Sequence, residues 1–193
     1  RRADPKLFTV LAKMELKLLR GERDSARYFP KLCREIISQQ LSGKASHAIT
    51  WRFFALFPGR RVTSARVLLL SEKKLRATGM SWAKARYVRD LAHKTKTRTV
   101  RLAALPTMGD EAVIAELTKV KGIGQWTAEM FLIFTLGRED VFSFGDLGLK
   151  KGIAEVYGAH RARTKRSIET ITERWAPYKS YGSLAIWHIL DSG

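Results

Sequence analysis

The sequence predicts an all-α protein. Apolar residues recur at helical spacing almost throughout the 193-residue chain, and residues 126–136 are apolar on every side, which is typical of a buried helix. Only Val141–Phe144 has the character of an extended segment, and so short a run does not form a sheet. Hydrophobic residues make up 45% of the chain and charged residues 28%, so we expect a folded globular core and not a disordered chain.

Amphipathic helices are predicted wherever apolar residues recur every three or four positions. In chain order, these segments are residues 7–18, 32–37, 45–56, 85–92, 114–117, 126–136, 168–175 and 180–190. Pro30 precedes the second segment, Pro58 and Gly59 stop the third, and Pro177 closes the seventh, because proline and glycine begin or end helices. Trp175, in the seventh segment, is assigned to the core.

The charge balance favours a polyanionic partner. Lys and Arg number 36 and Asp and Glu 18, which gives a net charge of +18 and a pI near 10.4. Nucleic acid is favoured over membrane, since no uncharged run approaches the ~18 residues of a membrane span. Residues 59–101 hold thirteen Lys and Arg against Glu72 and Asp90. Some of these cationic side chains are expected to lie on solvated helix faces. The rest are expected to contact a phosphate backbone.

Metal chemistry and secretion are not indicated. Cys33 is the only cysteine, and His47, His93, His160 and His188 lie far apart, so neither a disulfide framework nor a zinc site is expected. No required cofactor is predicted. Without a secretory leader, the protein is expected to be intracellular, in the cytoplasm or nucleoid of a prokaryote or the nucleus of a eukaryote.

The most specific stretch is LTKVKGIGQWTAEMF, residues 117–131. A helix runs into a turn with Gly122 and Gly124 two positions apart, and a second helix follows at once. Glycine at both positions permits positive φ and close approach of another backbone. The amides of the turn and of the following helix then suit a phosphate oxygen, and Lys121 adds a positive charge. An ordinary αα-turn is the alternative interpretation.

With this hairpin, the sequence resembles the helix–hairpin–helix DNA glycosylases, and among them the 3-methyladenine DNA glycosylase II branch of alkylation repair. The resemblance extends from about Asp4 to Leu190. It is carried also by four segments, IISQQLSGKA (36–45), GMSWAKARYVRDLA (79–92), VFSFGDLGLKKG (141–152) and RWAPYKSYGSLAIWHIL (174–190). It implies a monomer of two helical lobes, one of residues 28–138 with the hairpin and one of residues 1–27 plus 139–193 with the catalytic acid, and a site in the cleft between them.

Asp146 stands directly before a helical stretch, where an N-cap is the structural interpretation. The resemblance implies that it is also the catalytic residue. Cleavage of an N-glycosidic bond builds positive charge on the sugar, which a carboxylate stabilises, and the same group can orient the attacking water. Bifunctional relatives carry a Schiff-base lysine two positions after the second hairpin glycine. Trp126 stands at that position here, which implies a monofunctional enzyme.

The resemblance also implies a base pocket and a DNA-contacting surface. The pocket residues are Trp126, Trp187, Phe144, Leu147 and Met130, and the indole faces would attract a cationic alkylated base. The expected DNA contacts are Gln39, Gln40, Leu41, Ser42, Lys44, Lys84, Arg86, Lys121, Gly122, Gly124 and Thr127. Among these, Leu41 would fill the gap left by the flipped nucleotide, or else pack as an ordinary loop residue.

A monovalent cation, Na⁺ or K⁺, is implied at the hairpin through the main-chain carbonyls of Thr118, Val120 and Ile123. The function predicted overall is excision of alkylated purines, of the 3-methyladenine and 7-methylguanine type, from damaged double-stranded DNA during base excision repair. Two alternatives remain at this point. One is a glycosylase for deaminated or oxidised bases, and the other is a helix–hairpin–helix module that binds DNA without catalysis.

Overall fold

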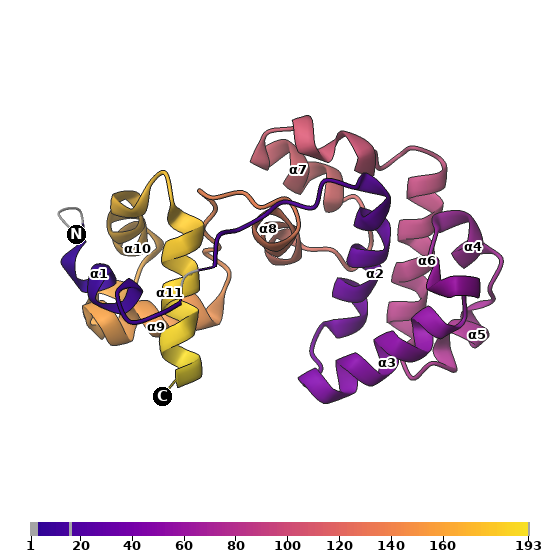
Figure 1. The fold of residues 1–193 in the computed structure, drawn as a ribbon, viewed down its shortest axis with the longest axis horizontal. Coiled ribbons are helices and arrows are strands. Elements are labelled where there is room, and N and C mark those ends of the chain that lie inside the picture. Colours follow the sequence, from indigo (N-terminus) through magenta and orange to yellow (C-terminus); the bar gives the residue numbers. More distant parts are fainter. Residues whose placement is uncertain (1–3, 16, 193) are drawn as a thin grey trace. The chain divides into compact units, whose positions relative to one another are not determined.

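The computed structural model describes residues 4–15 and 17–192. Residues 1–3, 16 and 193, which the predicted lobes include, lie outside the described residues. The described chain contains α-helices and 3₁₀-helices (η) and no strand, which confirms the all-α prediction (Figure 1). It divides into two compact units, one of Glu22–Phe131 and one formed by the chain up to Gly21 together with the chain from Leu132. No described helix is long and apolar enough to cross a bilayer.

In the unit of Glu22–Phe131, the longest helix packs against several others. The elements of this unit are η1 (Ser25–Arg27), α2 (Tyr28–Ser38), α3 (Gly43–Ala55), η2 (Pro58–Arg60), α4 (Ser64–Leu68), α5 (Glu72–Arg76), α6 (Trp82–Lys96), η3 (Leu102–Thr107), α7 (Asp110–Leu117) and most of α8 (Gln125–Phe134). Helix α6 packs against α2, α4 and α5. The apolar residues of α2 face this core because they recur at helical spacing, so that Leu32, Ile36 and Ile37 are fully buried.

The other unit carries α1 (Pro5–Leu11), the last turn of α8, α9 (Leu147–Tyr157), η4 (Ala159–Ala162), α10 (Lys165–Thr172), η5 (Glu173–Trp175) and α11 (Lys179–Ser192). Helix α9 packs against α11 and η4. Leu149, Ile153 and Ile186 are fully buried in its core, and Trp175 is 5% exposed, as predicted for a core tryptophan.

Two features differ from the sequence prediction. The first helix ends at Leu11 and does not reach Leu18, whose side chain is 68% exposed, so an apolar spacing alone overestimated its length. The short helices α4 and α5 were not predicted, because five residues give too little periodicity. Their start signals were nevertheless present, since Thr63 and Ser71 cap them through their side-chain oxygens.

Candidate functional site

Asp146 caps α9, as its position in the sequence predicts. Its Oδ1 accepts the backbone N–H of Leu149 at 2.8 Å and the indole N–H of Trp187 at 3.3 Å. The side chain is largely buried, since the residue is only 8% exposed. Two donors on one oxygen fix the orientation of the side chain, and the N-terminus of α9 favours its negative charge.

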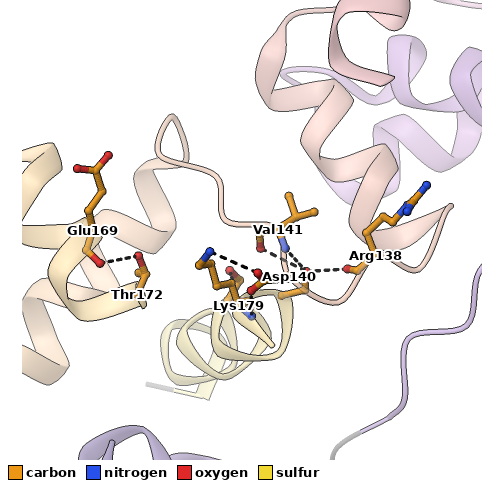
Figure 2. A network of polar contacts seen from close by, with 8 residues as sticks. Arg138, Asp140, Val141, Glu169, Thr172 and Lys179 are labelled. Atoms are coloured by element: carbon orange, nitrogen blue, oxygen red, sulfur yellow. Dashed lines mark hydrogen bonds and ion pairs between the residues drawn. The ribbon is translucent and has the colours of Figure 1, made fainter. Parts of the chain in front are cut away.

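The segment before Asp146 is tied to the start of α11. The buried hydroxyl of Ser180 donates to the carbonyl of Arg138 at 2.7 Å and accepts the N–H of Val141 at 3.0 Å. Figure 2 shows Lys179 reaching Asp140, whose carboxylate accepts both the backbone N–H and the ammonium of that lysine, at 3.2 and 3.4 Å. This network positions the chain that leads to Asp146.

The other predicted residues of this unit differ in accessibility. The ring of Trp187 lies 5.8 Å from that of Phe134, which is 50% exposed. Phe144 packs edge-on against Phe142, and the Lys165 ammonium lies 5.1 Å from the centroid of the Phe144 ring. The side chain of Leu147 is 78% exposed and therefore open to a ligand.

In the hairpin between α7 and α8, the backbone geometry requires a glycine at position 122 but not at position 124. Gly122 has φ +84°, and a Cβ there would lie 2.2 Å from the ring of Tyr87. Gly124 does not have positive φ, and a Cβ there would meet nothing within 4 Å. The space beside Gly124 is therefore open on the exposed side of the turn, where a phosphate backbone could approach the amides of α8.

Asp90 of α6 anchors this hairpin. Its Oδ2 accepts the backbone N–H of Lys121 at 2.8 Å and the Lys94 ammonium at 2.8 Å. The same ammonium donates to the carbonyl of Lys119. Burial opposes the charge of Asp90, but the hydrogen bonds from Lys94 and Lys121 outweigh it and lower the pKa of Asp90 below its usual value. The side chain of Lys121 remains exposed.

The turn between α2 and α3 is fastened to the hairpin by one amide side chain. Gln39 Nε2 donates to the carbonyl of Gly122 at 2.8 Å and to Thr127 Oγ1 at 3.3 Å. Gln40, the next residue, has φ +55°, and Leu41 is 37% exposed. A sharp turn thus presents a partly exposed apolar side chain, as an intercalating residue requires.

The ammonium of Lys84, a predicted phosphate contact, lies against the protein's own backbone. Its ammonium donates to the carbonyls of Ile37 and Gln39, at 2.8 and 2.6 Å, and so satisfies the C-terminal end of α2. Burial lowers the pKa of Lys84. This placement favours a positioning role for Lys84, because its donors are directed at the protein's own backbone. Lys44 and Arg86 are exposed and keep the surface placement that phosphate binding needs, as does Ser42, the N-cap of α3.

Trp126 contributes to a cavity of about 420 Å³ within the unit of Glu22–Phe131. Its indole is 44% exposed, while Met130, one turn later on α8, is 7% exposed and does not line this cavity. The lining residues are Glu35, Ser38, Gln39, Gln40, Leu41, Trp126 and Thr127. Glu35 was not among the predicted site residues. Its one signal in the sequence is an acidic side chain about one helical turn before Gln39.

The predicted cation ligands lie in the turn that follows α7. The carbonyl of Val120 accepts the N–H of Ile123 at 3.1 Å, and Thr118 donates its hydroxyl to the carbonyl of Ile114 at 2.8 Å. Carbonyl oxygens at the end of a helix suit a hard cation, so the turn is chemically compatible with Na⁺ or K⁺. No cluster of His, Cys, Asp and Glu able to hold a metal ion occurs among the described residues.

Comparison with known proteins gives consistent matches. Residues 33–177 match the family of HhH-GPD superfamily base excision DNA repair proteins. The chain is 31% identical over 166 residues to DNA-3-methyladenine glycosylase 1 of Schizosaccharomyces pombe, with 82% of this chain and 71% of the relative covered. A crystal structure of DNA-3-methyladenine glycosidase from Bacillus halodurans has a TM-score of 0.84 at 34% identity, and the match covers 97% of this chain and 85% of that chain.

Two further matches define the extent of the similarity. The S. pombe 3-methyladenine DNA glycosylase in complex with abasic DNA has a TM-score of 0.81 at 26% identity, over 97% of this chain and 92% of that one. A Bacillus subtilis relative is 31% identical over 162 residues, or 81% of this chain, and the chain spans only 56% of its length. The family model covers most of the present chain, and the helical fold and the hairpin agree with it. The chain therefore belongs to the HhH-GPD superfamily of base excision DNA repair proteins.

Proposed function

We propose that this protein is a monofunctional DNA glycosylase that hydrolyses the N-glycosidic bond of alkylated purines, of the 3-methyladenine and 7-methylguanine type, in double-stranded DNA. The observation that carries the proposal is Asp146, a buried carboxylate held by the N–H groups of Leu149 and Trp187. The names of the relatives, DNA-3-methyladenine glycosylase and glycosidase, support the substrate class. The S. pombe structure in complex with abasic DNA supports DNA as the partner.

DNA binding is assigned to the exposed side of the hairpin. The open space at Gly124 lets a phosphate approach the amides that begin α8, and the exposed Lys121 adds charge. Exposed cations such as Lys44 and Arg86 would extend this contact along the backbone. Leu41, on its turn between α2 and α3, would take the place of the flipped nucleotide in the base stack.

Base recognition is assigned to the cavity beside Trp126. A purine alkylated on a ring nitrogen carries positive charge, and an indole face attracts a cation by roughly 0.5–2 kcal/mol. The cavity of about 420 Å³ lies within the roughly 300–1,000 Å³ of small-molecule sites. An unmodified, neutral base would gain less from the indole, so Trp126 contributes to selectivity for damage.

Bond cleavage is assigned to Asp146. As the C1′–N bond of the nucleotide lengthens, positive charge develops on the sugar, and a fixed carboxylate stabilises that charge more than it stabilises the ground state. The same carboxylate can accept a proton from the attacking water. A cationic alkylated base leaves as a neutral molecule, so its departure needs little acid catalysis.

The monofunctional assignment rests on Trp126. An indole cannot form a Schiff base with the sugar, and the hairpin's own lysine, Lys121, is assigned to a DNA phosphate. After incubation with borohydride, we expect no covalent protein–DNA product, and strands should break only after treatment with alkali. A trapped complex would show that a lysine attacks the sugar and would contradict this assignment.

A Na⁺ or K⁺ ion held by the carbonyls of Thr118, Val120 and Ile123 is part of the proposal. Such an ion would supply positive charge for a DNA phosphate at the hairpin. The protein is proposed to act as a monomer.

The test of the catalytic assignment is Asp146→Asn. We expect release of 7-methylguanine to fall by about 10³-fold or more, while affinity for damaged duplex stays within a few-fold of the wild type. Asp4→Asn is the matched control, since Asp4 is also a buried N-cap in contact with a tryptophan. It should lower stability and leave the rate per folded molecule unchanged. Release that survives in Asp146→Asn would refute the assignment.

A further inference from the structure

The cavity beside Trp126 contains one titratable side chain, Glu35. Of the other lining residues, Gln39, Ser38 and Thr127 are polar but cannot change charge. Gln39 uses both hydrogens of its amide on Gly122 and Thr127, and Ser38 Oγ lies 2.6 Å from Ser46 Oγ. These hydrogen bonds are internal to the protein. The remaining polar lining residue, Gln40, has an amide side chain that cannot change charge either, so Glu35 is the lining side chain able to release a proton.

Glu35 is not committed in this way. Within the described residues its carboxyl group accepts no hydrogen bond and forms no ion pair, although the side chain is half-buried. A carboxyl group that is shielded from water and has no partner is costly as an anion and less costly as a neutral acid. The group therefore has the properties of a proton donor, in a space that an exposed indole also lines.

We propose that Glu35 is a second catalytic residue, which protonates uncharged purines bound in the cavity beside Trp126 and so extends excision to neutral damaged bases such as hypoxanthine. The inference rests on the proposed function, since it takes this cavity as the base pocket. It also gives the alternative of a deaminated-base glycosylase a physical basis, because the sequence alone revealed no side chain able to act on the base edge.

Proton transfer to the base comes before cleavage of the glycosidic bond. The Glu35 carboxyl group gives its proton to a ring nitrogen of the base, N7 of hypoxanthine, and becomes a carboxylate. The C1′–N9 bond then breaks, its electron pair goes to the base, and hypoxanthine leaves as a neutral molecule. Water adds its oxygen to C1′ and gives a proton to the Asp146 carboxylate, which passes it on to solvent, and an abasic site remains. Solvent returns a proton to Glu35. A base that is already cationic does not need the first transfer.

The electrostatic surroundings agree with this role. Burial raises the pKa of Glu35, against the opposing charges of Arg34 and Lys31 on the same helix. On α6, which packs against α2, Lys84 directs its ammonium to the carbonyls of Ile37 and Gln39. A raised pKa leaves a larger fraction of the carboxyl group protonated near neutral pH. Glu35 is therefore a more effective general acid there.

The experiment compares Glu35→Gln with wild type on two duplexes, one with 7-methylguanine and one with hypoxanthine, under single-turnover conditions. We expect Glu35→Gln to lose about 10²-fold or more on hypoxanthine and less than about threefold on 7-methylguanine. The wild-type rate on hypoxanthine should fall as the pH rises, and this dependence should vanish in the variant. Glu155→Gln, which neutralises an exposed glutamate of α9, is the matched control and should change neither rate.

The outcomes separate the two proposals. Wild-type release of 7-methylguanine tests the proposed function by itself. Equal losses on both duplexes would indicate a structural role for Glu35 and overturn this inference, as would a wild type that releases 7-methylguanine but not hypoxanthine. Thermal unfolding of Glu35→Gln identifies a folding defect, in which case Glu35→Asp, which keeps an acid at the position, should recover hypoxanthine release at least in part.

Discussion

The indole N–H of Trp187 donates to the carboxylate oxygen Oδ1 of Asp146 across 3.3 Å. The same unit repeats this relationship at the start of α1, where Trp175 Nε1 donates to Asp4 Oδ2 at 3.1 Å. Both aspartates are buried N-caps of their helices. Asp4 has a further donor, the hydroxyl of Tyr157 at 2.7 Å. One unit thus contains two similar carboxylate sites, of which one is assigned to structure and one to catalysis.

Replacing Trp187 by Phe removes the indole donor and keeps an aromatic ring. A hydrogen bond to a charged group contributes about 1.5 kcal/mol or more, so we expect a roughly tenfold lower rate of 7-methylguanine release in Trp187→Phe. The cause is looser orientation of Asp146. Single-turnover kinetics with enzyme in excess measures this rate, and fluorescence anisotropy should show nearly unchanged DNA affinity.

The corresponding change at Trp175 should affect stability and leave the catalytic rate unchanged. Trp175→Phe removes one donor from Asp4, inside the core, and should lower the free energy of unfolding by about 1–3 kcal/mol with no change in rate per folded molecule. Denaturant titration measures the first quantity. If both tryptophan variants lost activity to the same extent, the distinction between the two aspartates would be wrong.

The sequence predicted the residues whose signals are local. The N-cap at Asp146 and the core position of Trp175 follow from residue type and helical spacing, and both are confirmed. The turn at Gly122 was predicted from its paired glycines, but only the structure shows that the ring of Tyr87 fixes one of them and that the other faces open space. Contacts between segments distant in the chain leave no periodic signal.

The same reason explains why the sequence did not reveal the surroundings of Lys84 and Glu35. Lys84 belongs to a strongly basic stretch, so it was interpreted as a phosphate ligand, whereas its ammonium completes the end of α2. Glu35 was not selected, because only the fold places it beside Trp126. A side chain's charge is visible in the sequence, but its partner is not.

The two hairpin glycines should respond differently to alanine. Gly122→Ala forces a Cβ into the Tyr87 ring and strains a residue with φ +84°, so we expect it to destabilise the protein by about 1–3 kcal/mol or more. Gly124→Ala meets no neighbour within 4 Å and should leave stability within about 0.5 kcal/mol. Its Cβ should instead obstruct the approach of a phosphate and weaken duplex binding. Urea titration and anisotropy separate the two effects, and unchanged affinity in Gly124→Ala would argue against phosphate binding at this face.

Asp90 should make the hairpin sensitive to acid. The pKa of Asp90 in the folded protein lies below its usual value of 3.8, so the stabilising effect of the carboxylate is complete above that pH and is lost as the pH falls through the folded-state pKa. Asp90→Asn should therefore be less stable than wild type at pH 7, and the difference should shrink only below about pH 4. A difference that did not begin to shrink as the pH fell below about 4 would show that the carboxylate charge is not responsible.

The salt dependence of binding distinguishes phosphate contacts from positioning contacts. With roughly six phosphate contacts, log K should fall against log salt with a slope near −5, and each contact removed should reduce its magnitude by about 0.9. The exposed Arg86 should behave in this way when changed to Ala. Lys84→Met should keep the wild-type slope, because its ammonium is bound to the carbonyls of Ile37 and Gln39. It should slow base release instead, since the turn that carries Leu41 loses its support. A slope reduced equally by both variants would assign Lys84 to DNA after all.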